Sequence, residues 1–265
     1  MSNLQVVVLA IVQGLSEFLP ISSSGHLVLV PSVFGWTDQG MAFDVAVHFG
    51  SLTAVLIYFR GDIATLLKGS VQVLSGKVAS FEARFAFAIG IATIPAAIAG
   101  LLLASWIGAN LRDPSVIVGT LSGYAILMLL ADLYGKKNRV LTSIGIKDAV
   151  VIGVAQALAL VPGTSRSGVT ITAAMALGYE RTEAARFSFL LAVPIILLAT
   201  AYEISVLMSS EASVAWAQMG LGALISAIVA YLSIEFFMRF VSRVGLLPFA
   251  IYRLILAAVI LYALA

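Results

Sequence analysis

Long apolar runs are the feature that most constrains the fold of this chain. The stretch FAIGIATIPAAIAGLLLASW, residues 87–106, contains no charged residue, and a helix needs about 20 such residues to cross a bilayer. Of the 265 residues, 61% are hydrophobic and only 11% are charged, far more apolar than a soluble domain requires. Irregular backbone cannot face lipid, and the runs lack the polar alternation of barrel strands. We therefore expect an all-α polytopic membrane protein.

The composition also excludes several kinds of chemistry and several partners. The chain has no cysteine, so it has no disulfide, no thiolate nucleophile and no thiolate metal site. The net charge is only +2 and no basic stripe is present, so nucleic acid is not expected as a partner. The lipid bilayer is the expected partner, and no organic cofactor is expected. No basic residue precedes Arg60, so a cleaved signal peptide is not expected.

The apolar regions divide into six full spans and two broken segments. The six that are long enough to cross a membrane are residues 41–59, 84–106, 115–134, 184–206, 215–236 and 247–264. Residues 4–36 and 148–178 are apolar too, but polar residues and proline interrupt each of them. Each is therefore expected to form a short helix, a polar break and a second short helix, which is typical of a re-entrant hairpin.

The two broken segments resemble each other when the sequence is shifted by 143 residues. The identical pairs are Val8 and Val151, Gln13 and Gln156, Leu15 and Leu158, Ser22 and Ser165, Ser24 and Ser167, and Gly25 and Gly168. A re-entrant hairpin adds no crossing, and three spans follow each segment. The second half therefore starts on the opposite side of the membrane, and we expect it to have the inverted orientation. We expect a single membrane domain, residues 1–265, with a first repeat at 1–140 and an inverted second repeat at 141–265, whose breaks meet near the midplane.

Basic residues are distributed unevenly between the two sides of this topology. Those on the side opposite the N-terminus are Arg60, Lys68, Lys77, Arg84, Lys136, Lys137, Arg139, Lys147, Arg181, Arg186, Arg239 and Arg243. Only Arg112 lies on the side of the N-terminus, while Arg166 and Arg253 fall inside apolar segments. Because loops rich in Lys and Arg stay in the cytoplasm, both termini and the mouth of the first hairpin are expected outside it.

Each break contains one charged side chain, Glu17 in the first and Arg166 in the second. Charges at membrane depth are costly and usually functional, and these two become neighbours if the breaks meet. A structural ion pair that locks the halves together is one explanation, but it leaves the nearby hydroxyl groups unexplained. Gln13 lies four residues before Glu17 and shares its helical face. Arg253, in the last span, either lines a cavity or pairs with a carboxylate such as Asp44.

Hydroxyl groups and glycines begin the helix that follows each break. They are Ser22, Ser23, Ser24 and Gly25 in the first break and Gly163, Thr164, Ser165 and Ser167 in the second. Free backbone N–H groups at a helix start favour anions, phosphate above all, and Arg166 offers a fork for phosphate oxygens. Helix capping alone explains one such cluster. Two clusters together with Arg166 and Glu17 favour a site for two phosphate groups.

The two histidines have different expected roles. His26 follows Ser23 by three residues, so a helix would place the hydroxyl and the imidazole on one face, as a nucleophile with its base. A capping or interfacial role for His26 is the alternative. His48, with Asp44 one turn before it, is expected to pack or to support the site. No zinc pattern is present, but Glu17 together with substrate phosphates offers a site for Mg²⁺ or Ca²⁺.

The motifs QGLSEFLPISSSGH and PGTSRSGVT resemble the two signature regions of the undecaprenyl-diphosphate phosphatases of the bacitracin-resistance type. The resemblance extends over essentially the whole chain. It implies an enzyme of the bacterial inner membrane, open to the periplasm, that hydrolyses undecaprenyl diphosphate to the monophosphate and inorganic phosphate. This reaction recycles the lipid carrier for peptidoglycan and confers bacitracin resistance. The resemblance also implies an inverted repeat with two re-entrant hairpins.

The same resemblance implies roles for particular residues. It assigns catalytic importance to Glu17, Ser23, His26 and Arg166, with Ser165 and Ser167 around the phosphate. Thr170, in the second motif, is expected to support them. One departure is Gln13, where the family often has glutamate. An amide cannot act as a base or neutralise a cation, so a metal site built on two carboxylates is put in doubt.

These residues suggest a mechanism and leave competing functions open. In the expected mechanism Ser23 attacks the terminal phosphorus or orients water, and His26 and Glu17 share proton transfer. Arg166 stabilises the developing charge while the prenyl tail lies among the spans. The main alternative is a transporter or flippase of a lipid phosphate, because inverted repeats with broken helices are typical of transporters. A structural scaffold explains neither break. A homodimer is allowed by the sequence but not indicated by it.

Overall fold

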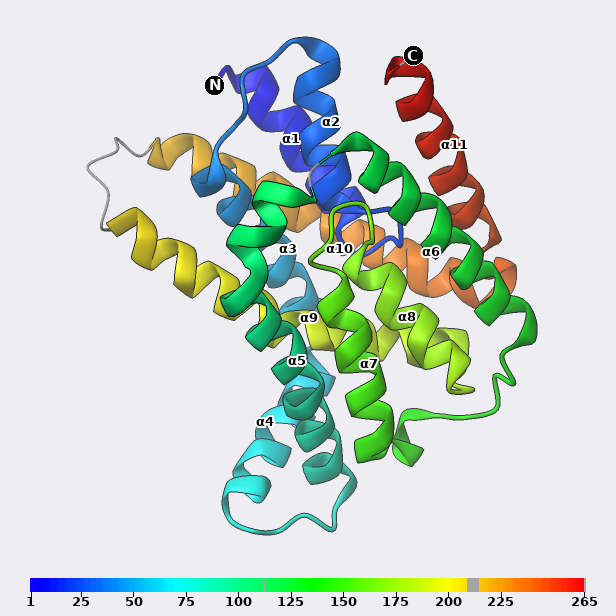
Figure 1. Ribbon diagram of the computed structural model, residues 1–265. Coiled ribbons are helices and arrows are strands. Elements are labelled where there is room, and N and C mark those ends of the chain that lie inside the picture. Colours follow the sequence, from blue (N-terminus) through cyan, green and yellow to red (C-terminus); the bar gives the residue numbers. More distant parts are fainter. Residues whose placement is uncertain (112, 209–214, 265) are drawn as a thin grey trace.

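The computed structural model describes residues 1–111, 113–208 and 215–264, and the regular elements in these ranges are helices (Figure 1). They are α1 (Asn3–Ser16), α2 (Ser23–Phe34), α3 (Met41–Tyr58), α4 (Arg60–Leu74), α5 (Phe81–Asn110), α6 (Pro114–Tyr134), the 3-10 turn η1 (Leu141–Ser143), α7 (Ile146–Leu158), α8 (Arg166–Ala176), α9 (Arg181–Met208), α10 (Trp216–Val244) and α11 (Leu247–Leu264). The expected all-α class is confirmed over these residues. Arg112, the basic residue expected on the side of the N-terminus, lies outside the described residues.

Five helices in the described part of the chain are long and apolar enough to cross a membrane, judged by length and composition. They are α3, α5, α6, α9 and α10, which occupy the positions of five of the six expected spans. The sixth expected span, 247–264, is α11, whose apolar part Leu247–Tyr262 is shorter than the other five. A polytopic membrane protein is therefore supported, while a crossing by α11, and with it the total of six, stays a prediction.

One helix, α4, lies where the sequence predicts a loop. It is separated from α3 by Phe59 alone and folds back against the start of α5. Gly69 approaches the backbone of Glu82 so closely that a Cβ atom would not fit. Lys68 Nζ lies 2.7 Å from a carboxylate oxygen of the same glutamate. Charged residues lower the hydropathy of α4 below that of a span, which is why the apolar pattern does not reveal it.

The two broken segments fold as expected, into a helix, an irregular break and a second helix. The first break, residues 17–22, lies between α1 and α2, and the second, residues 159–165, lies between α7 and α8. Each break is named together with the first turn of the helix that follows it, so that the first includes Ser23 and the second includes Arg166 and Ser167. In Figure 1, α1 and α2 extend toward the end that holds both chain termini, whereas α7 and α8 extend the opposite way, toward the end that holds α4. The breaks touch, because the Ser167 hydroxyl donates a hydrogen bond to the carbonyl oxygen of Leu19 at 3.0 Å.

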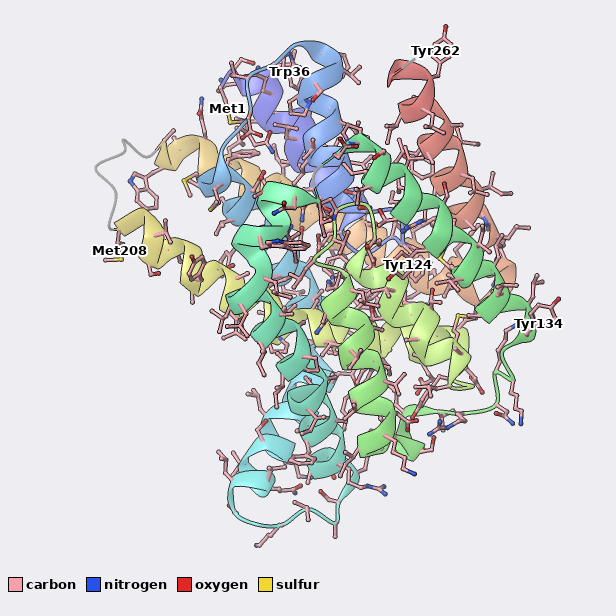
Figure 2. The ribbon with its side chains drawn as sticks, in the orientation of Figure 1. Met1, Trp36, Tyr124, Tyr134, Met208 and Tyr262 are labelled. Atoms are coloured by element: carbon pink, nitrogen blue, oxygen red, sulfur yellow. The ribbon has the colours of Figure 1, made fainter. Side chains whose placement is uncertain are left out.

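Apolar side chains fill the core and also cover much of the surface. Large apolar side chains such as Leu101 and Leu102 of α5 are exposed, which suits contact with lipid, and Tyr134 and Tyr262 project outward (Figure 2). The buried polar side chains near the breaks are Gln13, Glu17, Ser22, Thr164, Ser165, Ser167, Thr170 and Arg253. Because polar groups inside a membrane are costly, this cluster marks the region where function is expected.

The contact between α3 and α10 depends on small residues. Gly50 packs directly on the backbone of Ala223, and a Cβ atom there would not fit. One residue further along α3, the Ser51 hydroxyl lies 2.9 Å from the Ser226 hydroxyl, which also donates to the carbonyl oxygen of Val47 at 2.7 Å. Helices in lipid associate through such close contacts and hydrogen bonds, because lipid tails leave no hydrophobic driving force between them.

This packing predicts a difference between two glycine substitutions. Gly50→Ala should lower the thermal midpoint in detergent by several degrees, because overpacking of a close contact costs about 1–3 kcal/mol. Gly90→Ala in α5 is the control, since a Cβ atom at Gly90 meets nothing within 4 Å, and it should leave the midpoint unchanged or raise it slightly. Equal midpoints for the two variants would contradict the close packing of α3 on α10.

Candidate active site

The first break is set by Pro20 and Ser22. α1 ends at Ser16, four residues before Pro20, because in a continuing helix the proline ring would clash with the carbonyl of residue 16. Ser22 has φ 75°, in the left-handed region that side chains rarely adopt. α2 begins at the next residue, so Ser23 stands in its first turn, and no side chain caps that turn.

The second break repeats this geometry at the aligned positions. Ser165, which aligns with Ser22, also has positive φ, 70°, and α8 begins directly after it. The hydroxyl oxygens of Ser165 and Ser167 lie 3.3 Å apart, and those of Ser22 and Ser24 lie 3.5 Å apart. The two helix starts that the sequence predicts as an anion site therefore share one local conformation.

Arg253 of α11 ties the backbones of the two breaks together. Its guanidinium donates hydrogen bonds to the carbonyl oxygens of Pro20 in the first break, at 3.4 Å, and Gly163 in the second, at 3.0 Å. Two further bonds reach the carbonyl oxygens of Thr120 and Leu121 in α6. The side chain is only 1% exposed. The sequence leaves the partner of Arg253 open, and the structure shows that this cation is bound by backbone carbonyl groups.

Glu17 is the centre of the polar contacts between the breaks. One carboxylate oxygen accepts a hydrogen bond from Arg166 Nη2 at 3.0 Å. The other accepts from Ser23 Oγ at 2.7 Å and from Gln13 Nε2 at 3.0 Å, and His48 Nε2 lies 3.5 Å from it. Glu17 and Arg166 are thus neighbours, as expected if the breaks meet. A buried carboxylate needs such a compensating cation and such donors.

Arg166 is held in place from both sides. Its second terminal nitrogen donates to the carbonyl oxygen of Ser188 in α9 at 3.0 Å, and its guanidinium lies 5.8 Å from the centre of the Phe18 ring. The Ser188 hydroxyl lies 2.6 Å from the Thr170 hydroxyl, and the supporting role of Thr170 stays a prediction. Ser188 is a site residue that the sequence does not reveal, because it lies within an apolar span and outside both motifs.

A cavity of about 360 Å³ opens beside Glu17. The expected site residues that line it are Glu17, Ser23, Ser24, His48, Ser165 and Arg166. The expected residues that lie buried behind this lining are Gln13, Ser22, Gly25, Gly163, Thr164, Ser167 and Thr170. The rest of the wall includes apolar side chains of α9, such as Ile195 and Ile196. The cavity therefore joins a polar end to an apolar wall, as an amphipathic ligand requires.

Three further polar residues, Asp44, Gln156 and Thr200, line the cavity and are not assigned to the site by sequence. Asp44, at the start of α3, accepts a hydrogen bond from Gln39 at 2.8 Å. Gln156, in α7, donates to the carbonyl oxygen of Ala92, while its own Oε1 is buried without a hydrogen-bond partner among the described residues. The alignment of Gln156 with Gln13 is the sequence signal that points to it.

The ring nitrogens of His26 contact groups other than the hydroxyl of Ser23. Its Nδ1 lies 2.7 Å from the carbonyl oxygen of Ser22, and its Nε2 lies 2.6 Å from the hydroxyl of Tyr252 in α11. The hydroxyl of Ser23 is instead bonded to Glu17. The position of Glu17 next to Ser23 favours the carboxylate as the proton acceptor for this serine.

The surroundings of Glu17 fit a divalent cation poorly. Both carboxylate oxygens already accept hydrogen bonds, and the guanidinium of Arg166, 3.0 Å away, would repel a cation bound to the same carboxylate. Within the described residues, no three His, Cys, Asp or Glu side chains are grouped so that they could hold a metal ion. Binding of Mg²⁺ or Ca²⁺ at Glu17 stays a prediction, and the mechanism is derived from protein groups alone.

Comparison with known proteins identifies the family. The family described as bacitracin resistance protein BacA matches residues 6–259. The chain belongs to the BacA family. It is 50% identical over 263 residues to the undecaprenyl-diphosphatase of Thioalkalivibrio sulfidiphilus, with 99% of each chain covered. It is also 50% identical to the undecaprenyl-diphosphatase of Hahella chejuensis (97% of each chain) and to undecaprenyl-diphosphatase 2 of Stutzerimonas stutzeri (98% of each chain).

The region shared with the BacA family contains the whole candidate site. Both breaks, the residues that line the cavity and the arginine that ties the breaks together all lie within residues 6–259. The match to the family therefore extends over the part of the chain that holds the candidate site.

The bond between the breaks gives a prediction for stability. Ser167→Ala should lower the free energy of unfolding by about 0.5–1.5 kcal/mol, the usual net contribution of one hydrogen bond, because the carbonyl group of Leu19 then keeps only the backbone N–H of Ile21 as a donor. Ser70→Ala is the control, since that hydroxyl is exposed and bonds within α4. Denaturant titration in detergent micelles measures both, and equal stability of the two variants would contradict the contact between the breaks.

Proposed function

We propose that this protein hydrolyses undecaprenyl diphosphate to undecaprenyl phosphate and inorganic phosphate. Its relatives named undecaprenyl-diphosphatase, half identical over nearly the full length of both chains, support the assignment. The cavity supports it as well, since a polar end suits a diphosphate and the apolar wall suits the start of a prenyl chain.

The observation that carries the proposal is the hydrogen bond from the Ser23 hydroxyl to Glu17, with Arg166 on the other oxygen of the same carboxylate. This arrangement puts a hydroxyl nucleophile, a proton acceptor and a cation at the wall of one cavity. A nucleophile with a base in hydrogen-bond contact is the usual means of activating serine. If Glu17 and Arg166 formed only a structural ion pair, the Ser23 hydroxyl would not be needed beside them.

The proposed reaction proceeds in two steps. In the first, Ser23 Oγ attacks the terminal phosphorus while its proton moves to Glu17. The bond from that phosphorus to the bridging oxygen breaks, Glu17 passes the proton to the leaving oxygen, and undecaprenyl phosphate leaves. In the second, water attacks the phosphoserine, Glu17 takes up the proton of the water, and the serine oxygen leaves and is protonated again. Direct attack by water that Ser23 orients is the alternative course.

Arg166 and the two helix starts supply the electrostatic part of the mechanism. Charge spreads over the phosphoryl oxygens in the transition state, and a preorganised guanidinium fork stabilises it. Arg166 is preorganised by its bond to the carbonyl of Ser188. The first turns of α2 and α8 bring Ser24 and Ser165 to the same cavity, where free N–H groups favour an anion.

The wider assignment belongs to the same proposal. The chain would lie in the bacterial inner membrane with both termini and the active site facing the periplasm, as the distribution of basic residues favours. Its halves, 1–140 and 141–265, would be inverted repeats, which the matching conformations of Ser22 and Ser165 support. The reaction would recycle the lipid carrier for peptidoglycan synthesis and so confer resistance to bacitracin.

A phosphate-release assay tests the proposal. Purified protein in detergent should release inorganic phosphate from undecaprenyl diphosphate. Arg166→Ala should lower kcat by about 10²–10³-fold, the loss of about 3–4 kcal/mol typical of one preorganised electrostatic contact. Ser23→Ala should lower kcat at least as much, whereas Ser32→Ala, whose exposed hydroxyl bonds within α2, should be unaffected.

Two outcomes would contradict the proposal in different ways. Near-normal turnover by Ser23→Ala would exclude the nucleophile role of this serine. No phosphate release by the unaltered protein, together with movement of a lipid phosphate across vesicle membranes, would favour the transporter or flippase.

A further inference from the structure

His26 of α2 and Tyr252 of α11 form a pair, although they are 226 residues apart in sequence. His26 Nε2 lies 2.6 Å from the tyrosine hydroxyl, and the two rings stack with their centroids 5.7 Å apart. His26 Nδ1 lies 2.7 Å from the carbonyl oxygen of Ser22. Because a carbonyl oxygen can only accept, Nδ1 carries the proton, and Nε2 accepts from Tyr252. Both ring nitrogens are therefore engaged away from the Ser23 hydroxyl.

Ser22 is the residue that these bonds hold. Its left-handed backbone conformation is unfavourable for a serine and persists only where the surrounding structure holds it. The Ser22 carbonyl oxygen accepts two hydrogen bonds from His26, from the backbone N–H at 3.3 Å and from the ring N–H at 2.7 Å. Because Ser23 is the next residue, the conformation of Ser22 determines the position of the Ser23 backbone and the direction of its side chain.

The second break holds its left-handed serine in another way. The Ser165 hydroxyl accepts a hydrogen bond from the backbone N–H of Gly168 at 3.2 Å and so caps α8. At the first break no side chain caps α2. The residue aligned with His26 is Val169, which has no polar side chain. One break thus has a cap and no imidazole, while the other has an imidazole and no cap.

We propose that His26, itself held by Tyr252, is a positioning residue that keeps Ser22 in its left-handed conformation and thereby aims Ser23 at Glu17. The inference rests on the proposed phosphatase activity and replaces the proton-transfer role expected for His26. The role needs a hydrogen-bond donor at the position of Nδ1. It does not need a group that gains and loses a proton.

Substitution of His26 by its two amide analogues tests this role. Asparagine places an N–H donor where Nδ1 stands, so His26→Asn should keep kcat within about threefold of the unaltered protein. His26→Ala and His26→Gln lack a donor at that position, so their kcat should fall about 10- to 100-fold. This is the range expected when Ser22 is no longer held in its strained conformation. Equal losses in His26→Asn and His26→Ala would overturn the inference and favour proton transfer by the imidazole.

Tyr252→Phe tests the second half of the pair. Loss of the hydroxyl should lower kcat about fivefold, as expected for one hydrogen bond. Tyr262→Phe is the matched control on the same helix, because its side chain is 86% exposed, and it should have no effect. A Tyr252→Phe variant as active as Tyr262→Phe would contradict the role of Tyr252.

A spectroscopic measurement tests the geometry without relying on activity. The chain has only two histidines, His26 and His48, so ¹⁵N-histidine labelling gives two ring systems that a His48→Gln variant tells apart. At about pH 8, above the ordinary histidine pKa, His26 should show a protonated Nδ1 and an unprotonated Nε2. Tyr252→Phe should shift the Nε2 signal of His26. A proton on Nε2 would contradict the inference even if the proposed phosphatase activity were absent.

Discussion

A helix that breaks inside a membrane exposes backbone groups that lipid cannot satisfy, and this constraint organises the protein. Backbone carbonyl groups of the two breaks accept hydrogen bonds from side chains elsewhere in the protein. Ser167 of the second donates to the carbonyl oxygen of Leu19 in the first, and Arg253 donates to a carbonyl group in each. The Arg253 guanidinium is buried without a carboxylate beside it in these bonds, because four backbone carbonyl groups accept its hydrogen bonds. The last helix, α11, therefore holds the two breaks together through Arg253.

The same constraint explains why chemistry gathers here. Once the breaks are in contact, Glu17 and Arg166 compensate each other, and the carboxylate is free to hold the Ser23 hydroxyl at the cavity wall. The backbone conformation at Ser22 and Ser165 is unfavourable in both breaks, and strain of this kind is commonly found at functional sites. The irregular backbone of the two breaks thus brings the Ser23 hydroxyl and the Arg166 guanidinium to the wall of one cavity.

Much of this architecture follows from sequence patterns, because apolar length and polar interruption are local properties. Five spans, both breaks and the proximity of Glu17 to Arg166 are predicted in this way. The exceptions depend on contacts between distant segments. α4 is too charged to resemble a span, Ser188 lies unmarked in an apolar helix, and the partners of Arg253 are backbone groups that no motif reveals. The contact of His26 with Tyr252 is not apparent from the sequence for the same reason, since Tyr252 comes from the far end of the chain.

The central claim is that Glu17 and Arg166, one from each half, act as a single unit in one active site. A double-mutant cycle on kcat/KM for prenyl diphosphate hydrolysis tests it most directly, using Glu17→Gln, Arg166→Gln and the combined variant. If the two residues act together, the combined variant should be no worse than the poorer single variant, within about threefold. Losses that multiply would mean that the two side chains act independently, and would contradict the account.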